Sequence, residues 1–222
     1  MKISNHLTSG ICAGAILSAL ALSSTVRADT LSLHVDVNTS ALAAAGTPPK
    51  PFAIDFQLNG GSPNGNSVTI NHFTFGGGSA TALPAATFAS GLGTGDLAST
   101  VVLTDNAGNP FSEFYQGFNP GTAFGFDVSF SLNVNSPIPD QFTFAILDNN
   151  LLNLASTDPS GADSLFRLNI VNSKLSLNPY QAYGLSSPFS GVTVTVVPET
   201  GTWSIGIVLS LAAWRLAARR RR

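Results

Sequence analysis

A strict alternation of apolar and polar residues over residues 124–134 constrains the fold of this chain more than any other feature. Phenylalanine, valine or leucine occupies every even position, and a small or polar residue occupies every odd one. A helix of about 3.6 residues per turn would spread these apolar side chains around its axis, whereas a strand places them all on one face. The stretch therefore predicts a long, half-buried antiparallel strand.

The same period of two recurs along much of the chain, and clusters of Gly, Asn, Asp and Pro separate the alternating stretches. Such clusters are typical of turns. We expect nine or ten strands, almost no helix and an all-β fold, an antiparallel β-sandwich of jelly-roll type. Residues 76–99 are expected to form a long loop with short extended pieces, and residues 40–51 a helical turn or two before a loop.

Two local features refine this prediction. Residues 52–58 and 68–75 alternate on either side of a segment rich in Asn and Gly, which makes them a hairpin candidate. The apolar phase slips between Ile70 and Phe73, so we expect a β-bulge at His72. The phenylalanines fall on the inward phase of their strands, and we expect them to form the core.

The N-terminal 28 residues have the pattern of a secretory signal peptide. A basic residue precedes an apolar run, and a Val-Arg-Ala sequence ends at Ala28, just before Asp29. The only cysteine, Cys12, lies within this segment. We therefore expect a mature chain that begins at Asp29, contains no disulfide and forms one extracellular domain over residues 29–197.

The segment 29–197 is acidic although the whole chain is nearly neutral. It holds three basic residues against eleven acidic ones, a difference of −8, while the formal charge of the entire chain is −2. Acidic surfaces repel phosphates, so we exclude nucleic acid as a partner. Calcium remains the ionic partner that such a surface could bind.

The C-terminal residues 198–222 form a tripartite segment. A short polar motif precedes 14 uncharged residues, Gly201 to Trp214, which span about 21 Å as a helix. That length is short of a hydrocarbon core of about 30 Å, but an arginine reaching toward the headgroups can extend it. We expect a transmembrane helix with a cytoplasmic arginine-rich end. The motif comprises Val197, Pro198, Glu199 and Thr200, and the anchor and positive end comprise Trp203, Trp214, Arg215, Arg219, Arg220, Arg221 and Arg222.

This tail resembles the PEP-CTERM sorting signal of Gram-negative bacteria, which is also described as an ice-binding protein C-terminal domain. The resemblance covers about 26 residues and departs from the family at Thr200, where a second proline is usual. It implies an exosortase as processing enzyme, and a membrane-anchored precursor that is delivered to the cell surface or the extracellular biofilm matrix. Because Pro198 to Gly201 also resembles a sortase motif, a sortase substrate is an alternative, and a plain anchor helix is another.

The sequence contains no motif of nucleophilic or metal-dependent catalysis, and none of its aspartates lies in an apolar context expected to raise its pKa. We therefore expect a non-catalytic surface or matrix protein. The alternative is a module that binds exopolysaccharide, which calcium could assist. Its candidate stacking residues are Tyr115, Tyr180 and Tyr183.

Oxygen-rich side chains between residues 148 and 163 could hold calcium, but their spacing does not match an EF-hand loop. The competing interpretation is that they cap turns of a loop. These candidates are Asp148, Asn150, Asp158 and Asp163. The two histidines outside the signal peptide, His34 and His72, are far apart in sequence, and we expect solvated strand positions rather than a metal pair.

Overall fold

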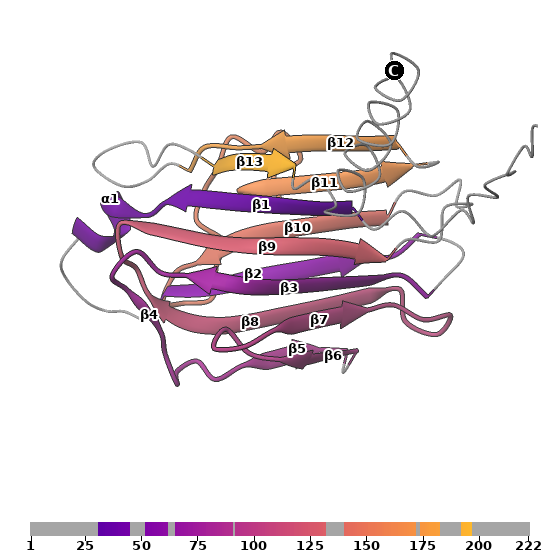
Figure 1. The fold of residues 1–222 in the computed structure, drawn as a ribbon, viewed down its shortest axis with the longest axis horizontal. Helices are drawn as coiled ribbons and strands as arrows, with labels where there is room; N and C mark the ends of the chain where they lie inside the picture. Colours follow the sequence, from indigo (N-terminus) through magenta and orange to yellow (C-terminus); the bar gives the residue numbers. More distant parts are fainter. Residues whose placement is uncertain are drawn as a thin grey trace, which may run out of the picture.

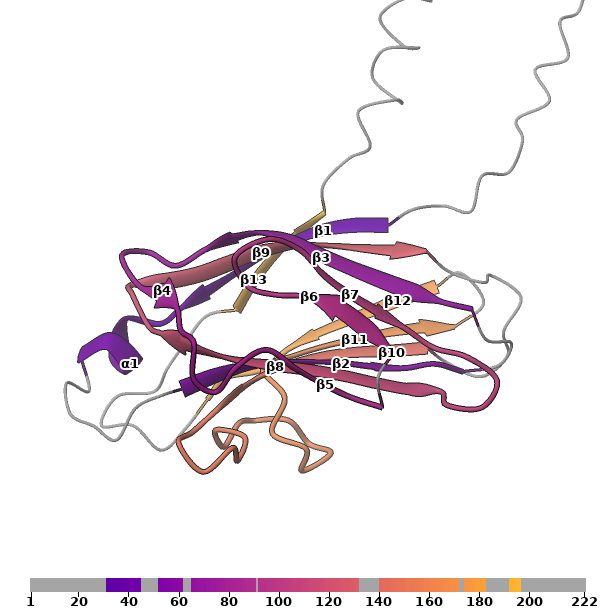
Figure 2. The same ribbon diagram turned by 90° about the horizontal axis from the view of Figure 1, so that it is seen from below.

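The computed structural model describes residues 31–44, 52–61, 65–90, 92–131, 140–171, 174–182 and 192–196. Within these residues the chain forms two antiparallel sheets that pack face to face as a β-sandwich, with one short helix (Figures 1 and 2). The all-β prediction is therefore confirmed.

The chain crosses repeatedly between the two sheets, although the three strands within residues 140–179 follow one another in the same sheet. Sheet A has the order β13 (Val192–Val196), β1 (Leu31–Asn38), β9 (Ala123–Ser131), β3 (Ser67–Thr74), β7 (Val101–Thr104) and β6 (Gly93–Gly95). Sheet B has the order β12 (Lys174–Pro179), β11 (Phe166–Val171), β10 (Asp140–Leu147), β2 (Phe52–Asn59), β8 (Phe111–Asn119) and β4 (Ser79–Ala80), with β5 (Thr87–Ala89) also paired to β8. The helix α1 (Ser40–Ala44) follows β1.

The core lies between the sheets and is rich in phenylalanine. Even-numbered residues of β2, β9 and β10 point inward, as the period of two predicts. The prediction of a phenylalanine core is confirmed, with Phe111 as an exception on the outward phase of β8. The fully buried phenylalanines are Phe56, Phe114, Phe118, Phe124, Phe126, Phe130, Phe142, Phe144 and Phe166.

The predicted hairpin of β2 and β3 is wrong, because β2 lies in sheet B and β3 lies in sheet A. The connection crosses from one sheet to the other and is held by two buried carboxylates. Asp105 accepts hydrogen bonds from the backbone N–H groups of Gly65 and Asn66, and Asp140 accepts one from Gly61 at 2.6 Å. Alternation indicates that one face of a strand is buried, but it does not indicate which strand lies beside it.

Three finer predictions can be compared with the structure. A β-bulge lies at His72, where the pairing register of β3 with β9 shifts between Asn71 and Thr74. The backbone φ angle of His72 is +53°, in the left-handed region. The helical turn after residue 40 is present as α1. The predicted number of strands is too low, since the described residues form thirteen, and β4, β5 and β6 lie in the segment expected to be mostly loop.

The first and last described strands are neighbours. Strands β1 and β13 pair antiparallel at one edge of sheet A, with Leu33 opposite Val196. The predicted signal peptide with its cleavage site at Ala28 and Asp29, and the predicted tail from Val197 onward, lie outside the described residues. Among the residues that are described, no helix is long and apolar enough to cross a membrane.

Candidate functional site

The outward face of sheet B carries a network of polar side chains on neighbouring strands. Because Phe56 and Phe114 point inward, their odd-numbered neighbours on β2 and β8 point outward. Asp55 thus lies directly opposite Tyr115. Beside them, Nε2 of Gln57 donates to Oδ2 of Asp55 at 2.8 Å and to Oε1 of Glu113 at 3.0 Å. One amide therefore bridges two carboxyl groups on adjacent strands.

Asp55 is the most perturbed carboxyl group of this face. The residue is only 2% exposed, and its Oδ1 is buried without a hydrogen-bond partner. Burial, reinforced by the nearby charge of Glu113, raises the pKa of Asp55 to about 7, although the hydrogen bond from Gln57 acts in the opposite direction. The prediction that no aspartate has an environment that raises its pKa is wrong, because the local sequence does not reveal which strands enclose this position.

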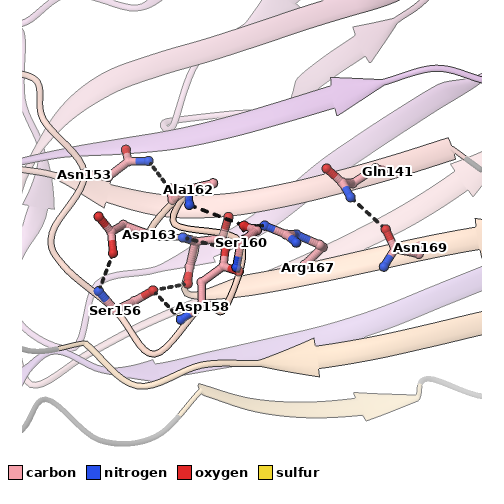
Figure 3. Close-up of polar contacts among 10 residues, drawn as sticks. Gln141, Asn153, Ser156, Asp158, Ser160, Ala162, Asp163, Arg167 and Asn169 are labelled. Atoms are coloured by element: carbon pink, nitrogen blue, oxygen red, sulfur yellow. Dashed lines mark hydrogen bonds and ion pairs between the residues drawn. The ribbon is translucent and has the colours of Figure 1, made fainter.

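A set of four amide side chains, which we call the amide lane, continues along the same face. Its members come from β2, β10 and β11, and Nε2 of Gln141 donates to Oδ1 of Asn169 at 2.8 Å (Figure 3). Asn59 is exposed, and no hydrogen bond joins its side chain to another described residue. The lane comprises Gln57, Asn59, Gln141 and Asn169.

The loop of residues 148–164, between β10 and β11, packs against the outer side of sheet B beside this lane (Figure 2). An ion pair holds it there: Nη2 of Arg167 on β11 lies 2.6 Å from Oδ2 of Asp158 and also contacts Oγ of Ser160 (Figure 3). The guanidinium lies 5.9 Å from the ring centroid of Tyr180. Arg167 therefore joins the loop, the sheet and an aromatic side chain.

Three of the four calcium candidates in this loop, the aspartates, accept hydrogen bonds from backbone N–H groups. Oδ1 of Asp148 accepts from the N–H groups of Asn150 and Leu152, and Oδ1 of Asp163 accepts from the N–H of Ser156. Asp158 accepts from Ser160 and Ser164 as well as from Arg167. These contacts match the loop-capping interpretation. In the described part of the chain, no group of His, Cys, Asp and Glu has the arrangement of a metal site.

The ion pair predicts the effect of Asp158→Asn. Burial disfavours the charged form of Asp158, but hydrogen bonds from Ser160 and Ser164 and the charge of Arg167 outweigh it and lower its pKa. The substitution removes the charge and leaves Arg167 without its ionic partner, so we expect a loss of about 2 kcal/mol at pH 7 in urea unfolding. Asp163→Asn is the control and should cost less, because one oxygen still accepts the Ser156 N–H. An equal loss for both variants would contradict this role of Asp158.

A second polar cluster lies on the outer face of sheet A. Nδ1 of His34 lies 2.5 Å from Oδ1 of Asp127, Nδ1 of His72 lies 2.7 Å from Oδ2 of the same residue, and Nε2 of His34 lies 3.1 Å from Asp36. The sequence predicts solvated strand positions for both histidines, and the structure adds that both contact the same carboxylate. They converge because β9 lies between β1 and β3, and the bulge turns His72 toward Asp127. The side chain of His72 remains 75% exposed.

This cluster predicts a change in histidine titration. The hydrogen bond to Asp127 raises the pKa of His34 and outweighs the opposing effect of burial. In Asp127→Asn, we expect the His34 pKa to fall toward its ordinary value, as measured by NMR titration of the ring protons. Because the His34 pKa is raised on folding, the associated stabilisation is complete below about pH 6.5 and disappears as the pH rises through the folded-state value. Ser129→Ala, two residues away on the same face, should leave the titration unchanged; an unshifted His34 in Asp127→Asn would contradict the assignment.

The structure locates only some of the residues singled out from the sequence. Tyr115 is half-buried on the outward face of β8, and Tyr180 lies over Arg167 at the far side of the same sheet. Tyr183, the sorting motif and the arginine-rich end fall outside the described residues.

Comparison with known proteins adds no assignment. No family model matches the chain, and no curated protein matches it.

Proposed function

We propose that this chain is an exported, non-catalytic protein of the cell surface or the biofilm matrix of a Gram-negative bacterium. In this proposal a signal peptide directs export, the C-terminal helix anchors a precursor in the membrane, and an exosortase recognises the motif Val197 to Thr200. The sandwich is then the delivered part. We further propose a jelly-roll type connectivity, which is supported by the repeated crossing of the chain from one sheet to the other between β1 and β10.

The observation that carries this proposal is the position of the predicted cleavage sites relative to the strands. The proposed mature N-terminus, Asp29, precedes the start of β1 at Leu31, and the motif follows the end of β13 at Val196. Cleavage at both places would leave every described strand and the phenylalanine core intact. A domain that loses both ends during export must be stable without them, and the strand boundaries are consistent with that requirement.

The absence of catalysis in this proposal is supported by the environment of Asp55. A general acid needs a raised pKa, but it must also reach the substrate. Oδ1 of Asp55 has almost no accessible surface, and Oδ2 is bound to Gln57. A structural role for the Asp55 and Glu113 pair is therefore favoured over a catalytic one.

Two alternatives lead to different experimental results. A sortase substrate would be processed in a strain that lacks the exosortase, and a plain anchor helix would remain uncut. A calcium-assisted glycan module is less favoured, because backbone N–H groups occupy the carboxylates of Asp148, Asp158 and Asp163. A glycan module without calcium remains compatible with delivery to the surface.

Cell fractionation tests the proposed sorting. The wild-type protein should appear at the cell surface or in the matrix, whereas a chain with Pro198→Ala and Glu199→Ala should accumulate in the membrane as a longer precursor. Thr202→Ala, just beyond the motif, serves as the control and should be processed normally. Equal processing of the motif variant and the wild type would exclude recognition of this motif.

A further inference from the structure

We propose that the outer face of sheet B binds a neutral polysaccharide, and that the amide lane together with Phe111 forms the contact surface. The inference extends the proposed delivery of the protein to a polysaccharide-containing exterior, and in that sense it rests on the proposed function. Its basis is the chemistry of the side chains that four neighbouring strands place side by side.

The strand register places Phe111 and three members of the lane in one row, and Gln57 lies in the next row, opposite Glu113. Asn59 on β2 lies opposite Phe111 on β8 and, on its other side, opposite Gln141 on β10. Gln141 in turn lies opposite Asn169 on β11. Because adjacent strands lie about 4.8 Å apart, this row spans about 14 Å, which is enough for several sugar units.

Amide side chains suit the hydroxyl groups of sugars because each one offers a donor and an acceptor in a single plane. In the lane, the bond between Gln141 and Asn169 uses one group of each, which leaves Oε1 of Gln141 and Nδ2 of Asn169 available. The side chain of Asn59 has both groups available on an exposed position. A chain of sugar units lying across the strands can therefore exchange hydrogen bonds with all three residues.

Aromatic side chains border the same surface. Phe111 ends the row, and Tyr115 lies further along β8; both are half-buried and point outward, with Glu113 between them. Aromatic rings present apolar faces on which the C–H faces of a sugar ring can pack. The row thus combines hydrogen-bonding amides with one aromatic ring at its end.

The charges of this face indicate a neutral ligand rather than an acidic one. Glu113 lies beside the lane, and Arg167, which shares β11 with Asn169, is already paired with Asp158. An anionic polysaccharide would meet the carboxylate of Glu113, while the charge of this guanidinium is already neutralised.

The outer face of sheet A provides an internal control. One row carries Ser32, Ser129 and Thr69 in place of amides, and the row beside it carries His34, Asp127 and the single amide Asn71. None of these positions holds Phe, Tyr or Trp, so a hydroxyl-rich row with neither a series of amides nor an aromatic ring is available in the same molecule.

Affinity electrophoresis tests the proposal with protein expressed from the full-length sequence. The gels contain hydroxyethyl cellulose, dextran or galactomannan as neutral probes and alginate as an acidic one. We expect at least one neutral probe to retard the protein, alginate not to do so, and Asn59→Ala and Phe111→Ala each to weaken binding at least tenfold. The paired substitution Thr69→Ala with Ser129→Ala on sheet A should bind as the wild type does.

Several results would overturn the proposal: no retardation by any neutral probe, equal retardation by alginate, or unchanged binding by both sheet B variants. Asn59 is exposed and has no side-chain partner among the described residues, so Asn59→Ala should fold normally even if Phe111→Ala does not. Failure of binding leaves the sorting assay unaffected, because fractionation of the motif variant does not depend on a ligand.

Discussion

Phe56→Ala is expected to destabilise the sandwich by about 3–5 kcal/mol. Phe56 lies at the centre of sheet B, and its ring centroid lies between 5.0 and 6.2 Å from those of five other phenylalanines. They come from both sheets, so its removal leaves a cavity at the interface of the two layers and deletes several ring contacts. The free energy of unfolding in urea measures the loss.

Phe111→Ala is the matched control for this experiment. Phe111 is on β8 but points away from the core and is only half-buried, so its removal opens no internal cavity. We expect a loss of roughly 1 kcal/mol or less. If Phe56→Ala and Phe111→Ala cost the same, the two sheets do not pack through the phenylalanine layer.

Asp55→Asn is expected to stabilise the protein at pH 8 and to have little effect at pH 4. The folded-state pKa of Asp55 is raised from 3.8 to about 7 by burial and by Glu113. The folded protein therefore keeps a proton that the unfolded chain releases above about pH 4, so the stability falls as the pH rises toward 7. At about 1.4 kcal/mol per pKa unit, this penalty reaches at most about 4 kcal/mol. Asparagine is a neutral isostere of the protonated acid and removes the dependence on pH.

Urea unfolding of the wild type and the variant between pH 4 and pH 8 measures this effect. The difference between them should grow with pH and level off above the folded-state pKa. Thr143→Ala, on the neighbouring strand β10 opposite Gln57, is the control, because it removes no titratable group and should not produce such a rise. A difference that stays constant with pH would show that Asp55 is ionised in the folded protein.

Much of the fold can be predicted because the alternation of apolar and polar residues indicates which side chains of a strand are buried. The inward phase of Phe124, Phe126 and Phe130 on β9 is evident from the period of two, and the slip at His72 identifies the bulge. Partners of strands are not predictable in the same way. β2 and β3 are adjacent in sequence and both alternate, yet they lie in different sheets, because the buried carboxylates of Asp105 and Asp140 hold the connection between the sheets.

The candidate site is harder to predict for the same reason. Asp55, Gln57 and Glu113 meet only because β8 pairs with β2, although the chain separates Glu113 from Asp55 by more than fifty residues. His34, His72 and Asp127 likewise meet through the order of three strands in sheet A.

The aromatic residues on the outer face of sheet B can be only partly predicted from the sequence. Tyr115 can be singled out as a tyrosine among phenylalanines, but its surroundings are known only once the sheet order is known. Phe111 is missed, because phenylalanines on alternating strands are expected to point inward and only the phase of β8 shows that this one does not. Its amide neighbours on β10 and β11 are likewise known only from the sheet order.

Intact-mass measurement of the protein recovered from the bacterium that produces it tests the central claim most directly. The account predicts a polypeptide that begins at Asp29 and ends within or next to the motif around Pro198, recovered from the surface or the matrix. A full-length chain of 222 residues, uncut and located in the cytosol, would contradict it.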